Sequence, residues 1–131
     1  MQTLIVEDDF ASRFFIQKVL SAYGEVHVAV NGKEAVHAFQ MGLENETPYD
    51  LICMDLKMPE MDGHEAIQQI KALEREAGIP YENEVKTIIL SAFSDIKNVA
   101  TGFSHGADAY LVKPLDRNKL LEEIKKLGLL E

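Results

Sequence analysis

The feature that most constrains the fold is a regular alternation between short apolar runs and longer segments with helical spacing. The apolar runs cover residues 3–6, 26–30, 51–54, 85–90 and 109–112. Apolar side chains recur at helical spacing over residues 9–22, 32–41, 64–77, 95–105 and 116–127. Short, continuous apolar runs are typical of strands buried on both faces. The alternation therefore predicts an α/β fold, with helices on both faces of a five-stranded parallel sheet.

The length and composition suit one globular domain. With 131 residues, 47% of them hydrophobic and 27% charged, the chain can bury one core, so we expect a single domain over residues 1–131. The apolar runs are far shorter than the roughly 20 residues that a membrane span needs. The first residues carry no secretory signal, and one cysteine, Cys53, allows no intrachain disulfide. A cytoplasmic protein outside the membrane is expected.

The net charge argues against nucleic acid as a direct partner. Asp and Glu number 22 against 13 Lys and Arg, which gives a formal charge of -9. A phosphate backbone is bound by clustered cations, and this chain has an excess of anions. Most of that charge is expected to serve solubility, except where the acids cluster.

Polar or charged side chains follow four of the five apolar runs directly. Glu7 and Asp8 follow the first run, Asp55 the third, Ser91 the fourth and Lys113 the fifth. In an open parallel sheet, ligands bind just outside the carboxyl ends of the strands. We therefore expect these five side chains to converge on one site.

The residue types at this site favour phosphate and metal chemistry. Two carboxylates about 4 Å apart repel by about 4 kcal/mol at an effective dielectric near 20, so the acids need a cation. Mg²⁺ prefers carboxylate, water and phosphate oxygens. Lys113 offers a positive charge to a phosphoryl oxygen, and Ser91 offers a hydroxyl donor. The pattern predicts a Mg²⁺ and phosphoryl site, with a carboxylate that can act as a nucleophile.

Four motifs in this order carry a resemblance to a known family. The family has an acidic pair after strand one, D-x-x-M-P-x-M-D-G after strand three, Ser or Thr after strand four and Lys-Pro after strand five. This chain reads "VED", "DLKMPEMDG", "LSA" and "VKP" at those places. It resembles a receiver domain of the two-component response regulators, similar to the single-domain chemotaxis-type members. The resemblance implies a flavodoxin-like, doubly wound (βα)5 fold with strand order 2-1-3-4-5.

The resemblance also implies the roles of the acidic residues. Asp55 would accept the phosphoryl group. Asp8 would bind Mg²⁺ directly and Glu7 through water, where the family often has Asp in place of Glu7. The backbone carbonyl of Lys57 would be a further metal ligand, and Asp9 would cap the following helix.

The remaining site residues would sense the phosphoryl group. Ser91 would hydrogen-bond to it, and Lys113 would pair with it, and with the empty Asp55 beforehand. Tyr110 would move between outward and inward positions, and the Lys113–Pro114 bond would be cis. The implied function is a switch that receives phosphate from a histidine kinase or phosphotransfer protein, and that assists its own phosphorylation and dephosphorylation without being an enzyme. The switched face would comprise residues 95–105, 109–112 and 116–127.

Several alternatives stay open at this point. A Mg²⁺-dependent aspartyl-phosphate hydrolase would use a similar site, and a scaffold pseudo-receiver would keep the fold without phosphorylation. The run "GFSHG" at residues 102–106 matches a hydrolase elbow, but it follows a helical pattern where the elbow needs a strand. The sequence does not identify the kinase or the downstream target. It also does not decide whether the chain stands alone, whether it dimerises through residues 95–105 and 116–127, or how long the acyl phosphate lasts.

Overall fold

The computed structural model describes residues 1–56, 61–92 and 106–131, and its elements alternate along the chain as predicted. The strands are β1 (Thr3–Val6), β2 (Val26–Ala29), β3 (Leu51–Asp55), β4 (Lys86–Ala92) and β5 (Ala109–Lys113). The helices are α1 (Phe10–Leu20), α2 (Gly32–Glu44), α3 (Gly63–Glu76) and α5 (Arg117–Lys126), with short 3-10 turns at Ser21–Tyr23 and Tyr81–Asn83. The helix predicted over residues 95–105 lies outside the described residues.

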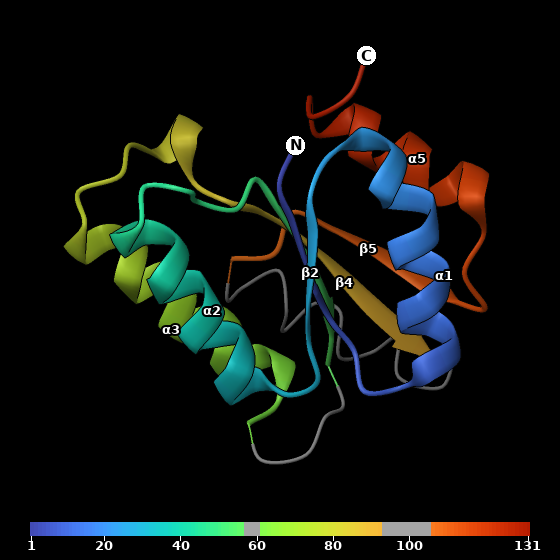
Figure 1. Cartoon of the computed structure of the whole chain (residues 1–131), viewed down its shortest axis with the longest axis horizontal. Helices are drawn as coiled ribbons and strands as arrows, with labels where there is room; N and C mark the ends of the chain where they lie inside the picture. The colour runs from blue at the N-terminus through green and yellow to red at the C-terminus, as the bar shows by residue number, and fades with distance from the viewer. Residues whose placement is uncertain (57–60, 93–105) are drawn as a thin grey trace.

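All five strands are parallel and lie in the order β2-β1-β3-β4-β5, which confirms the predicted fold. Helices α2 and α3 lie on one side of the sheet, and α1 and α5 lie on the other (Figure 1). The side chains of successive strand residues pack into opposite cores, since Leu4 belongs to one buried cluster and Ile5 to the other. Burial on both faces explains why the strands read as continuous apolar runs.

Several element ends differ from the prediction. Helix α2 continues to Glu44 rather than stopping at residue 41. Gly42 lies inside the helix, where an added Cβ would come 3.0 Å from Thr47 O, and Asn45 is the C-cap. Three strands also end later than their apolar runs, so that Asp55, Ser91 and Lys113 lie inside β3, β4 and β5 rather than after them. Ladder hydrogen bonds, which ignore side-chain polarity, set these ends.

Each described helix starts on a side chain that accepts a backbone N–H. Asp9 accepts from Ser12 N at 3.0 Å, as predicted for the α1 cap. The corresponding caps of α2, α3 and α5 are Asn31, Asp62 and Asp116. Such caps let a helix begin within a few residues of a strand end. The turns that lead from β1 into α1, from β2 into α2 and from β5 into α5 are therefore short.

Gly63 illustrates how tightly the chain packs under that edge. A Cβ added at Gly63 would lie 2.6 Å from the backbone oxygen of Asp55, closer than real side chains come. The Gly63 amide donates to the carbonyl of Leu56 at 3.1 Å. Glycine is needed here because the start of α3 passes directly against the end of β3.

Both termini lie at the edge of the sheet away from the strand carboxyl ends (Figure 1). The Met1 amino group donates to the carbonyl of Tyr23 at 3.2 Å, and Leu129 and Leu130 pack on the same buried cluster as Met1. Among the described residues, no helix combines the length and apolar character that crossing a bilayer would require.

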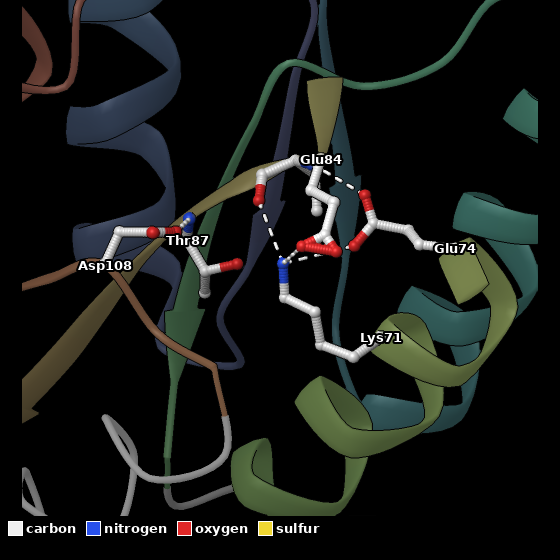
Figure 2. Close-up of polar contacts among 6 residues, drawn as sticks. Lys71, Glu74, Glu84, Thr87 and Asp108 are labelled. Atoms are coloured by element: carbon white, nitrogen blue, oxygen red, sulfur yellow. Dashed lines mark hydrogen bonds and ion pairs between the residues drawn. The ribbon is translucent and has the colours of Figure 1, made fainter. Parts of the chain in front are cut away.

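A buried ion pair ties α3 to the start of β4 (Figure 2). The Glu74 side chain is 1% exposed, and its Oε1 lies 3.2 Å from Lys71 Nζ. Glu74 Oε2 accepts from the Val85 amide at 2.7 Å, and Lys71 Nζ lies 3.6 Å from Glu84 Oε1. Burial raises the pKa of Glu74, and the Val85 amide and Lys71 offset part of that rise. Lys71 therefore compensates a carboxylate that has little access to water.

We predict that Lys71→Met lowers the free energy of unfolding by about 3 kcal/mol at neutral pH, because it leaves the Glu74 charge buried without its cation. Urea unfolding measures this loss, which should shrink as acid protonates Glu74. The control is Lys126→Met, whose pairs with Glu122 and Glu123 are exposed and should be worth under about 1 kcal/mol. Equal losses in the two variants would contradict the prediction.

Candidate functional site

Three carboxylates meet at the carboxyl edge of the sheet. One oxygen each from Glu7, Asp8 and Asp55 lies within 4.8 Å of the others. The sheet register explains the meeting, because Val6 of β1 pairs with Met54 of β3. The acids come directly after these two residues in the chain. Glu7 and Asp55 are buried, whereas Asp8 is exposed. A cluster of carboxylate oxygens of this kind matches the ligand preference of a hard divalent cation.

Lys113 brings a cation to this cluster from β5. Its Nζ lies 2.5 Å from Glu7 Oε1 and 3.7 Å from Asp55 Oδ2. Strand β4 separates β5 from β3, so the lysine side chain reaches across β4 to Asp55, and across β4 and β3 to Glu7 beyond the end of β1. The Lys113–Pro114 peptide bond is cis, as the resemblance implied.

Ser91 lies between the strands that carry Asp55 and Lys113. Leu90 of β4 pairs with Asp55, and Ser91 itself pairs with Val112. The Ser91 side chain is buried, and its hydroxyl donates to the neighbouring carbonyl of Ala92 at 3.1 Å. That local bond can be exchanged for a stronger acceptor without disturbing the ladder.

The structure describes Tyr110 and Asp9, but not Lys57, among the other predicted residues. Tyr110, on β5, is 40% exposed, which is an outward position. Lys57, the predicted backbone ligand, lies outside the described residues. Asp9 belongs to the helix cap rather than to the acidic trio, since its carboxylate accepts from Ser12 N.

The electrostatics of the site are dominated by the burial of Glu7. The pKa of Glu7 is raised to about 7, first by burial and then by the neighbouring Asp55, while Lys113 acts in the opposite direction. Burial lowers the pKa of Lys113, but its contacts with Glu7 and Asp55 more than offset this and leave it above its usual value. Glu7 Oε2 is buried and finds no hydrogen-bond donor among the described residues. The site therefore holds more anionic charge than Lys113 alone neutralises.

The thiol and the described histidine contacts give no competing chemistry. Burial raises the pKa of Cys53 to about 12, so this core thiol is unreactive, as its sequence position indicated. His27 contacts Tyr49 Oη at 2.6 Å and Glu25 Oε1 at 2.8 Å, which is a structural arrangement at the edge strand. The residues of "GFSHG" other than Gly106 lie outside the described residues.

One side chain beside the acids was not singled out by the sequence pattern. Arg13 of α1 donates from Nη1 to the backbone carbonyl of Glu7 at 3.2 Å. The contact spans six residues, which is not a helical repeat, so no periodicity in the sequence points to it.

Comparison with known proteins decides the family. A family model described as the response regulator receiver domain matches residues 3–125. The chain belongs to this family. A receiver domain is a phosphorelay signalling switch rather than a classical enzyme, and the chain shares that role.

The relatives show the same module in different settings. The chain is 32% identical over 125 residues to a "Probable transcriptional regulator ycf27" of Cyanophora paradoxa, covering 95% of this chain but 46% of that protein. Among solved structures, it is similar to the receiver domain of the histidine kinase CKI1 from Arabidopsis thaliana complexed with Mg²⁺, with a TM-score of 0.83 and 31% identity over 96% of this chain and 90% of that one. It is also similar to the co-crystal structure of Saccharomyces cerevisiae Ypd1 with the receiver domain of Ssk1, with a TM-score of 0.82 and 28% identity over 98% and 88%.

We predict that Glu7 makes the metal-free protein less stable as pH rises. Its pKa in the folded state, about 7, lies above the ordinary 4.5, so its contribution is fully present below pH 4.5 and is lost as pH rises through 7. The loss is about 3 kcal/mol, at about 1.4 kcal/mol per unit. Urea unfolding in EDTA at several pH values, for the wild type and Glu7→Gln, measures it by difference. An equal pH dependence in both proteins would contradict the prediction.

Proposed function

We propose that residues 1–131 form one receiver unit that accepts a phosphoryl group on Asp55 in a Mg²⁺-dependent reaction. The donor would be a phosphohistidine on a histidine kinase or phosphotransfer protein. The observation that carries the proposal is the meeting of Glu7, Asp8 and Asp55 within 4.8 Å, with Lys113 Nζ close to both Glu7 and Asp55. The Ypd1 complex of a similar receiver supports this kind of partner.

The residues present fit Mg²⁺. The donor set is all oxygen, and the buried Glu7 Oε2 has no hydrogen-bond donor among the described residues. Asp8 and Asp55 would hold the ion directly and Glu7 through water, with the Lys57 carbonyl as a further ligand. Bound Mg²⁺ supplies positive charge that neutralises the acids and the transferring phosphoryl oxygens.

The transfer step follows from the position of Asp55. Its side chain is 11% exposed, so one face of the carboxylate is open at the edge of the sheet. A carboxylate oxygen of Asp55 attacks phosphorus, the P–N bond to the donor imidazole breaks, and its electron pair stays on the imidazole nitrogen. Lys113 stabilises the charge on the phosphoryl oxygens, so acceleration comes mainly from positioning and electrostatics. Water can later attack the acyl phosphate at the same site, which is how the domain would assist its own dephosphorylation.

The new charge would change the face that carries Tyr110. The phosphoryl group adds about -1.5 to -2 charge and new acceptor oxygens. Ser91 would exchange its bond to Ala92 for one to the phosphoryl group, and Tyr110 would move inward toward the space it leaves. Beside Tyr110, a hollow of about 410 Å³ lies between β5 and α5, lined also by Leu115 and Lys119. This face, together with residues 95–105, would bind a downstream protein or a second copy of the chain.

The contacts to the phosphoryl group must supply enough free energy to shift the protein to its active state. Going from 1% to 99% of the active state needs about 5.5 kcal/mol of preference. Charge-assisted hydrogen bonds contribute about 1.5–3 kcal/mol each, so Ser91 and Lys113 with backbone donors can supply it. We also propose a cytoplasmic location and no direct binding to nucleic acid, in keeping with a net charge of -9.

We predict that Asp55→Asn abolishes labelling by a phosphorylated small donor with Mg²⁺, because the amide is not a nucleophile. Asp8→Asn should slow labelling by at least about tenfold at limiting Mg²⁺, since one metal ligand loses its charge. The matched control is Asp9→Asn, which keeps a capping side chain and should label at the normal rate. Acid-labile and base-labile ³²P incorporation measures the product. Unchanged labelling of Asp55→Asn would refute the assignment.

We predict that Ser91→Ala uncouples phosphorylation from the switch. The variant should still be labelled on Asp55. The NMR shifts of the Tyr110 ring should stay those of the unphosphorylated protein, because alanine has no hydroxyl to bond to the phosphoryl group. Ser21→Ala is the control, because Ser21 bonds only within the end of α1 among the contacts described. A full Tyr110 response in Ser91→Ala would remove Ser91 from the mechanism.

A further inference from the structure

Arg13 links the first turns of α1 to the end of β1. Its Nη1 donates to the Glu7 carbonyl at 3.2 Å, and the contact is partly buried. Strand β1 ends at Val6, so this carbonyl lies just beyond the strand. The hydrogen bond therefore fixes the oxygen of the peptide that joins Glu7 to Asp8.

Asp8 is held from both sides, although its own side chain is exposed. Before it, the Glu7 amide donates to Ala29 O at 3.1 Å, and the Glu7 carbonyl accepts from Arg13. After it, Asp9 accepts from Ser12 N through its carboxylate at 3.0 Å. Packing cannot orient an exposed carboxylate, so the direction of Asp8 depends on the backbone held between these contacts.

Phe10 supports the guanidinium in this position. The Arg13 guanidinium carbon lies 5.5 Å from the centroid of the Phe10 ring, within the range of a cation–π contact. The Phe10 ring in turn stacks on Phe14 with centroids 5.9 Å apart. Phe10 is 67% exposed, which is unusual for an aromatic side chain and is explained if the ring serves as a platform for Arg13.

We infer that Arg13 is a positioning residue for the acidic pair, which orients the Glu7–Asp8 peptide so that the Asp8 carboxylate faces the metal site. This role for Arg13 rests on the proposed Mg²⁺ site. Arg13 itself contacts a backbone oxygen and touches neither the reacting atoms nor the carboxylates in any contact described.

The direction in which Mg²⁺ affinity changes on substitution of Arg13 distinguishes this role from a simple charge effect. As a cation near the acids, Arg13 repels Mg²⁺, so removing its charge alone would tighten Mg²⁺ binding. Removing its hydrogen bond would loosen Asp8 and weaken Mg²⁺ binding. The two effects have opposite directions.

The experiment is calorimetric titration of Mg²⁺ into the unphosphorylated chain at fixed ionic strength. Arg13→Met keeps the length of the side chain but removes its charge and donors, and should weaken binding roughly fivefold to tenfold. Lys18→Met removes the same charge from an exposed site on α1, and should leave the affinity within about twofold. Arg13→Lys keeps the charge and one donor but loses the planar fork, and should lie between Arg13→Met and the wild type.

Amide hydrogen exchange in the metal-free protein gives a second readout that a merely unfolded variant would not reproduce. In Arg13→Met, the Glu7 amide, which donates to Ala29 O at 3.1 Å, should exchange faster, while that of Val19 in α1 stays protected. Unchanged or tighter Mg²⁺ binding by Arg13→Met would overturn the role of Arg13. A wild-type chain that binds no Mg²⁺ would instead overturn the proposed site, and the exchange rates would still judge whether Arg13 holds this peptide.

Discussion

The repulsion among three carboxylates within 4.8 Å is the constraint on which the rest of the structure depends. At about 4 kcal/mol per close pair, these groups would separate unless the chain held them. The sheet holds them, because β1 and β3 pair directly and both are buried on two faces. Lys113 neutralises part of the charge across β4, and Glu7 responds with a pKa raised to about 7. Holding these carboxylates together therefore lowers the stability of the fold.

The sequence was sufficient for the architecture and for the location of this cluster. Buried parallel strands leave a strong pattern, because every residue of a run such as 51–54 faces one core or the other. Polar residues at the ends of such runs are informative for the same reason, since each must have a partner at the edge of the sheet. The motifs then predicted the roles of Asp55 and Lys113, which periodicity alone left open.

The remaining features depend on contacts between residues that have no fixed spacing. Nothing in the sequence shows that Arg13 turns back to the Glu7 carbonyl, or that Lys71 and Glu74 form a buried pair at Val85. The extension of α2 to Glu44 likewise places Gly42 against Thr47, whose amide donates to the Gly42 carbonyl at 2.8 Å. A pattern of polar and apolar residues predicts which face is buried, but not which polar atoms meet there.

The two chain ends lie together at the sheet edge remote from Asp55, anchored through Tyr23 and the final leucines. A polypeptide joined at either end would leave from the side of the domain opposite the acids, and would not obstruct an approaching phosphoryl donor. The same geometry suits a domain that can be fused to unrelated effector domains without a change in the acidic site. Similar sequences occur within a longer probable transcriptional regulator and a much longer probable histidine kinase.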